Sequence, residues 1–156
     1  MSKRKAYRPK YSRQQMADKV QFALMGRSNE IVSDASGATE LVIFLWQYFA
    51  DLKDGTLGHK GYNILCAAAN IVVILCERGI MPEMLETCAE AQAHLNRAKD
   101  YWKSDGRFYV PESAYAAIAA LIETRDTIMN ADGYTAGLEY QAAAIVADRL
   151  NEGHTL

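Results

Sequence analysis

The longest apolar stretch of the chain, residues 61–76, constrains the fold more than any other feature. It reads GYNILCAAANIVVILC, contains no charged residue and is followed directly by Glu77 and Arg78. A helix that is apolar on nearly every side has to be enclosed by other elements. The stretch is too short, and too interrupted by asparagine, to indicate a membrane span, which needs about 18 or more apolar residues. We therefore predict a buried central helix over residues 59–78 and no contact with a membrane.

Amphipathic patterns on both sides of this stretch predict the helices that enclose it. Single glycines, prolines and serines mark short loops between them, and patterns typical of strands are nearly absent. The predicted helices cover residues 13–25, 38–53, 59–78, 82–103, 111–129 and 135–150. The length of 156 residues is that of one domain. The expected fold is all-α, a single-domain bundle of about five helices around the buried apolar central helix.

Charge is distributed unevenly along the chain. The first thirteen residues carry six positive charges and no negative one. The whole chain has 17 Lys+Arg and 19 Asp+Glu, so the remaining 143 residues hold 11 basic and 19 acidic residues, a net charge of −8. A charged start without apolar periodicity is typical of a disordered tail. We predict a basic, disordered tail over residues 1–12 and a helical domain over residues 13–156.

The tail is the first candidate binding segment, and three interpretations of it remain open. Its lysines and arginines fit the phosphates of a nucleic acid, on whose exposed bases tyrosines stack. The same charges fit an acidic surface of a protein, either in this chain or in a partner, and a merely solvated tail is the third interpretation. The candidate tail residues are Lys3, Arg4, Lys5, Tyr7, Arg8 and Lys10.

A second candidate surface flanks the predicted turn at residues 104–106. Protein interfaces are enriched in Trp, Tyr and Arg, and all three residue types gather here. The candidate partner-binding residues are Tyr101, Trp102, Arg107, Phe108 and Tyr109. The other aromatic cluster, Trp46, Tyr48 and Phe49 in the predicted helix 38–53, is interpreted as core.

Patterns for catalysis and metal binding are weak. Glu86, Glu90 and His94 share one helical stripe, but a di-iron bundle site needs a Glu-x-x-His step on two helices and further carboxylates. Arg149 and His154 have the Arg-x4-His spacing of a family of helical ribonucleases, but they lie where a terminal helix frays. We therefore predict no enzymatic activity, no metal site and no cofactor.

The cysteines and the first residues indicate the compartment. Cys66, Cys76 and Cys88 all lie in apolar helical patterns. Three cysteines at such positions favour buried thiols in a reducing cytosol over a disulfide framework. The start of the chain is charged and lacks the apolar region of a secretory signal. We expect a cytoplasmic protein, with Cys66 and Cys76 buried in the central helix.

Four segments resemble a family of short proteins found in bacteriophages and prophages of proteobacteria. They are RKAYRPK near the start, AAANIVVILCERG over residues 67–79, AEAQAHLNRAK over residues 89–99, and NEGHTL at the end. The resemblance covers about residues 1–10 and 65–156. It implies a small phage-encoded accessory protein in the cytoplasm of a bacterial host, and it supplies no activity and no catalytic residues.

These observations lead to two functional hypotheses. The first is a non-enzymatic phage accessory protein that binds and inhibits a host protein, and a CRISPR-type defence effector is the version to test first. Its acidic body would fit a basic groove by charge complementarity, although such charge also simply keeps a domain soluble. The alternative is a nucleic-acid-binding regulatory or packaging protein that acts through the basic tail.

Overall fold

The computed structural model describes residues 35–131 and 133–152, and every regular element in these ranges is a helix. The long helices are α2 (Ala35–Asp54), α3 (His59–Glu77), α4 (Leu85–Asp105), α5 (Tyr115–Met129) and α6 (Ala136–Asn151). Two short 3-10 helices, η2 (Pro82–Met84) and η3 (Glu112–Ala114), lead into α4 and α5. The predicted all-α bundle is confirmed. The predicted tail 1–12 and helix 13–25 lie outside the described residues.

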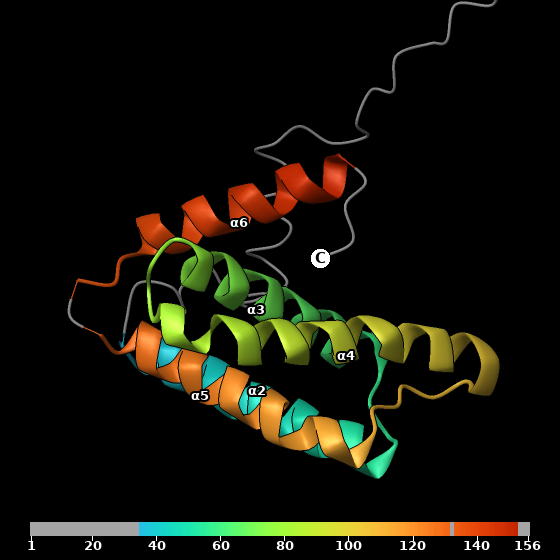
Figure 1. Cartoon of the computed structure of the whole chain (residues 1–156). Helices are drawn as coiled ribbons and strands as arrows, with labels where there is room; N and C mark the ends of the chain where they lie inside the picture. Colours follow the sequence, from blue (N-terminus) through green and yellow to red (C-terminus); the bar gives the residue numbers. More distant parts are fainter. Residues whose placement is uncertain (1–34, 132, 153–156) are drawn as a thin grey trace, which may run out of the picture.

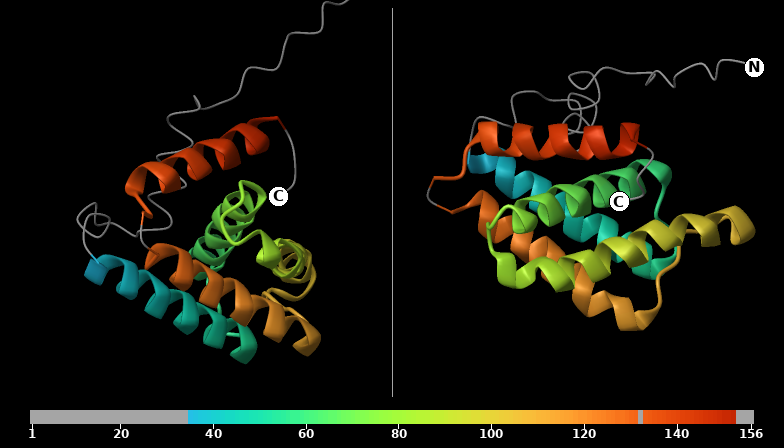
Figure 2. Two further views of the ribbon diagram at one scale, coloured as in Figure 1. Left: turned by 60° about the vertical axis from the view of Figure 1, so that its left-hand side comes forward. Right: turned by 45° about the horizontal axis from the view of Figure 1, so that its top comes forward.

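Helix α3 is the centre of the bundle. It packs against α2, α4, α5 and α6, and Figure 2 shows α6 on one side of it and α2 and α5 on the other. By length and composition α3 is apolar enough to cross a membrane, yet 72% of its most apolar window is buried inside the domain. The absence of charge between its ends therefore produces a core helix, because four neighbouring helices cover its surface.

Proline and glycine set the ends of the helices around α3. The chain leaves α3 through Gly79 at a φ of 95°, while the Ile80 N–H donates to the Leu75 carbonyl at 3.0 Å. This pattern is a Schellman motif, whose left-handed position favours glycine. Pro82 was predicted as the first residue of the next helix. It instead begins η2, and α4 starts three residues later at Leu85.

Helix α6 is held by small side chains and by two ion pairs. Its buried face toward α3 includes Ala142, Ala143 and Ala147, which bring little apolar surface. The exposed pair joins Arg149 to both carboxylate oxygens of Glu77, at 3.2 Å and 2.6 Å. Figure 1 shows α6 along one side of the bundle.

The second ion pair of α6 is buried. Arg125 on α5 is 0% exposed and donates through Nη2 to Glu139 Oε1, while the Tyr134 hydroxyl donates to Glu139 Oε2. Burial alone would lower the pKa of Arg125, but the facing Glu139 carboxylate raises it above its usual value. Nε and Nη1 of Arg125 are buried, and neither has a hydrogen-bond partner in the described part of the chain. The Glu139 carboxylate therefore supplies the negative charge that compensates the buried positive charge of Arg125.

One of the three thiols differs in exposure from the prediction. Cys76 and Cys88 are buried, but Cys66 is only half-buried, which corrects its expected place in the core. The reason is a narrow stripe of α3 that includes Cys66, Ala67 and Asn70 and is not fully enclosed by its neighbours. Burial raises the pKa of Cys66 to about 11 and that of Cys76 to about 12.

Thiol labelling of the native protein is expected to be slow and ordered. At pH 8 a pKa of about 11 leaves roughly one Cys66 in a thousand as the reactive thiolate, so Cys66 should react slowly and Cys76 and Cys88 more slowly still. The rate at Cys66 should rise about tenfold for each pH unit between 8 and 10. Iodoacetamide labelling followed by mass spectrometry measures all three sites. Reaction of Cys76 at the rate of the unfolded chain would contradict the buried position.

Candidate interaction site

The predicted partner-binding residues gather at one end of the bundle. Figure 1 shows the last turns of α4 extending past the other helices, at the end where α2 leads into α3. The chain then returns to α5 through an extended link at residues 107–111. We call this region the aromatic end and define its outer residues as His59, Tyr101, Trp102, Arg107 and Tyr109.

A buried pair of rings supports the aromatic end from below. Phe108 stacks on Tyr62, with ring centroids 4.1 Å apart and planes 9° from parallel. The Tyr62 hydroxyl donates to the Leu95 carbonyl at 2.8 Å and so joins α3 to α4. Burial raises the pKa of Tyr62 far above its usual range, so the hydroxyl stays a donor. Phe108 was predicted as a contact residue, but it is 4% exposed and is a supporting residue instead.

Trp102 and His59 form the next layer outward. The His59 ring stands edge-on to Trp102 at 4.5 Å and to Phe108 at 5.2 Å. Trp102 is half-buried and packs against the core, whereas His59 is exposed. Trp102 therefore offers one part of its ring to a partner and fixes the end of α4 with the rest.

The outermost layer is a pair of exposed tyrosines beside an arginine. Tyr101 on α4 and Tyr109 on the link are 43% and 51% exposed, and their rings meet edge to face at 5.1 Å. Arg107 is exposed and lies over the turn between α2 and α3, within 4 Å of the space beside Gly55. Two large rings and a guanidinium are thus presented together on a supported surface.

The charges at the aromatic end are mixed in sign. Its exposed charged residues on α4 and the following turn are Lys99, Asp100, Lys103, Asp105 and Arg107. A surface that repels neither sign strongly fits a protein better than it fits a polyanion, because nucleic-acid sites are strongly basic.

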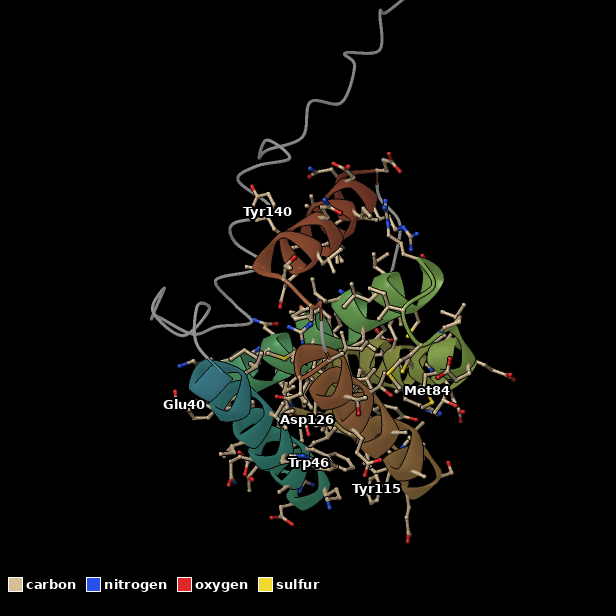
Figure 3. The ribbon with its side chains drawn as sticks, turned by 90° about the vertical axis from the view of Figure 1, so that its left-hand side faces the viewer. Glu40, Trp46, Met84, Tyr115, Asp126 and Tyr140 are labelled. Atoms are coloured by element: carbon tan, nitrogen blue, oxygen red, sulfur yellow. The ribbon has the colours of Figure 1, made fainter. Side chains whose placement is uncertain are left out.

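The structure also contains an exposed apolar surface that the sequence interpretation missed. On α2, Ile43, Phe44 and Trp46 are 60%, 50% and 38% exposed, and we call these three residues the outer face of α2. Trp46 was interpreted as core, and of its aromatic neighbours only Phe49 is fully buried. Figure 3 shows Trp46 at the side where α2 and α5 run together. Assigning only the positions at strict helical spacing to the core would have placed the outer face of α2 on the exposed side. These positions are Leu41, Leu45, Phe49 and Leu52.

The weak metal and nuclease patterns form no assembled site in the described chain. Glu90 and His94 approach to 3.9 Å, and the other ring nitrogen of His94 lies 3.3 Å from Arg97. Among the described residues no three His, Cys, Asp or Glu side chains come together as metal ligands. His154 lies outside the described residues, and Arg149 pairs with Glu77.

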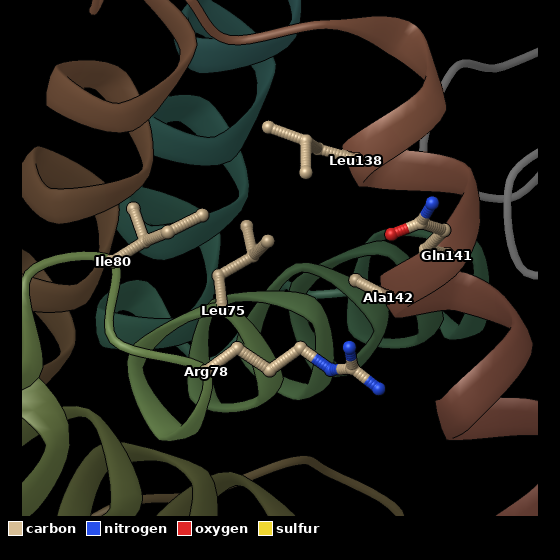
Figure 4. A pocket seen from close by; sticks show the side chains of 6 residues that line it. All are labelled: Leu75, Arg78, Ile80, Leu138, Gln141 and Ala142. Atoms are coloured by element: carbon tan, nitrogen blue, oxygen red, sulfur yellow. The ribbon is translucent and has the colours of Figure 1, made fainter.

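One pocket lies between the end of α3 and the start of α6. It has a volume of about 380 Å³, and Figure 4 shows the side chains that line it. Its lining residues are Leu75, Arg78, Ile80, Leu138, Gln141 and Ala142. The apolar floor with two polar groups at the rim is far from the aromatic end, and none of the predicted site residues belongs to it.

Comparisons with known proteins assign no family and no function to the chain. The chain matches no protein-family model, no curated protein and no solved structure.

Proposed function

We propose that this protein is a non-enzymatic phage accessory protein that acts by binding a host protein through the aromatic end. Inhibition of a bacterial defence effector of the CRISPR type is the specific version of this proposal. The phage origin rests on the four sequence segments described above, and the binding role rests on the aromatic end.

The observation that carries the binding role is the exposed pair Tyr101–Tyr109 beside Arg107. Large rings with two rotatable bonds lose little conformational entropy when a partner covers them. Phe108 and Trp102 hold the backbone beneath these rings, so the surface is organised before a partner arrives. Preorganised aromatic and arginine residues are the usual centres of binding energy in protein interfaces.

Substitutions at the aromatic end test this role. Tyr109→Ala and Arg107→Ala are each expected to weaken binding to the host protein, once a pull-down from host lysate has identified it, by more than about 1 kcal/mol. Both side chains are exposed, so the free energy of unfolding should change little. Isothermal titration with that host protein measures the binding free energy, and urea unfolding measures the free energy of unfolding. Glu123→Ala on the exposed face of α5 is the control and should bind as the native protein does.

The alternative function, nucleic-acid binding through the basic tail, has a different signature. The six positive charges of the first thirteen residues face a body of net charge −8, which repels phosphate. Binding to duplex DNA through roughly four to six phosphates would give a log–log salt slope of about −3.5 to −5.5. Deleting residues 1–10 would then abolish binding, while Tyr109→Ala would have no effect. The same two variants therefore separate the two functions.

A further inference from the structure

The outer face of α2 is an apolar surface that the other described residues leave open. The inward stripe of α2 is buried, so an exposed apolar face on the opposite side is not needed for the core. Among the rings that the structure describes, Phe44 stacks on its own helix neighbour Tyr48, at 6.3 Å, and Trp46 tilts against Phe49 at 6.2 Å. Single exposed apolar residues are normal, but three within four positions of one helix indicate a covered surface.

Charge changes along α2 beyond this face. Ile43, Phe44 and Trp46 lie in the first two-thirds of the helix, and two carboxylates follow near its end. Asp54 is exposed, while Asp51 is half-buried and accepts a hydrogen bond from Gln47 at 3.1 Å. The exposed Glu40 also precedes the apolar face, so a partner that fits α2 along its length is apolar in the middle and basic on both sides.

The chain that precedes α2 has the same two properties, an apolar stripe and basic residues beside it. Thirty-four residues come before Ala35. Residues 13–25 carry apolar side chains at helical spacing, at Met16, Val20 and Ala23/Leu24. Six basic residues lie within residues 3–13, and Lys19 and Arg27 follow. A segment that packs on the helix it leads into, through a short connection, returns antiparallel to it.

We propose that residues 13–25 of this chain cover the outer face of α2 as an antiparallel helix, with the basic tail directed toward Asp51 and Asp54. Thirteen helical residues span about 19 Å, which is long enough to cover Ile43, Phe44 and Trp46. Residues 26–34 form the connection, close to the usual length of a helix–helix loop. The direction places the apolar residues over the apolar face and the basic tail toward Asp51 and Asp54.

This interaction is independent of the aromatic end. It assigns the basic tail a position within the protein, and it makes the outer face of α2 unavailable to a second copy of the chain. Whether residues 13–25 cover α2 therefore does not depend on the proposed host-protein binding.

Thiol accessibility in the full chain tests the contact. With Ile43→Cys as the probe, adding Met16→Asp and Val20→Asp should increase the labelling rate at position 43 at least about tenfold, because the covering helix is released. Gln14→Asp with Gln21→Asp adds the same charge away from the apolar stripe and should leave the rate unchanged. Glu90→Cys on α4 is the second control, and its labelling should be equal in all backgrounds. The native thiols give a low background because burial raises their pKa.

A cross-link identifies the occupant. Val20→Cys with Ile43→Cys should form a disulfide within one chain under mild oxidation, at a yield that does not change on tenfold dilution. Asp18→Cys with Ile43→Cys places the thiol on the opposite side of the segment and should cross-link much less. Disulfides only between two chains would overturn the proposal in favour of a dimer through α2. Equal labelling of Ile43→Cys in all backgrounds, without any cross-link, would overturn it in favour of an open face.

Discussion

Replacing Glu139 with leucine is expected to lower the free energy of unfolding by about 3–5 kcal/mol, which is the usual cost of leaving a buried charge without its partner. Arg125 is 0% exposed, and Glu139 is the residue that accepts its hydrogen bond. Two of its nitrogens have no hydrogen-bond partner among the described residues, so Glu139 supplies the carboxylate that compensates the guanidinium. Urea unfolding followed by circular dichroism measures the change.

Two control variants separate this effect from a general loss of packing. Arg125→Met with Glu139→Leu removes both charges and should return most of the lost stability, since apolar replacements of a buried pair are often neutral. Glu77→Ala breaks the exposed pair with Arg149 and should cost less than about 1 kcal/mol. If Glu139→Leu and Glu77→Ala destabilise the protein equally, the buried pair does not have the role assigned to it.

Leu65→Ala is expected to destabilise the protein by about 2–5 kcal/mol, because it opens a cavity in the middle of a close-packed core. Leu65 is 1% exposed on α3, the helix that contacts the four other long helices. Leu150→Ala on α6 makes the same chemical change at a side chain that is 40% exposed and should cost less than about 1 kcal/mol. Thermal and urea unfolding of the pair measure the difference. Similar costs at both positions would show that α3 is not the central helix.

The central helix could be predicted because its signal is local. A run of sixteen residues without a charge permits only a position enclosed by other elements, and α3 occupies that position. The first residues of α4 and α5 were predicted less accurately. Pro82 and Pro111 marked where each helical segment begins, but a turn of 3-10 helix precedes each α-helix. Such turns at helix ends leave almost no pattern in a sequence.

The aromatic end shows which part of a site sequence spacing can resolve. The five predicted residues are neighbours in the chain, and the structure separates them into outer and supporting residues. In the extended link, Phe108 and Val110 point inward while Tyr109 points outward. This alternation follows from the period of two of an extended chain. Applying this two-residue period to residues 108–110 of the sequence would have excluded Phe108 from the predicted partner-binding residues.

The buried ion pair and the outer face of α2 depend on tertiary packing. Arg125 and Glu139 are 14 residues apart, beyond the reach of helical spacing rules, and they meet only when α6 folds back over the bundle. The helical period of α2 separates Trp46 from the stripe of Leu41, Leu45 and Phe49, but it does not say whether another element covers the Trp46 side. Only the positions of α3 and α5 decide which side of α2 is inward.

Photo-crosslinking at Tyr109 tests the central claim most directly. A benzophenone amino acid replaces Tyr109 in one variant and the exposed Glu123 in another, and each protein is produced in a proteobacterial host cell and irradiated there. We predict a nuclease-resistant product of discrete mass from position 109 that contains one host protein, and none from position 123. Equal products from both positions, or a product from position 109 that nuclease removes, would contradict binding of a host protein through the aromatic end.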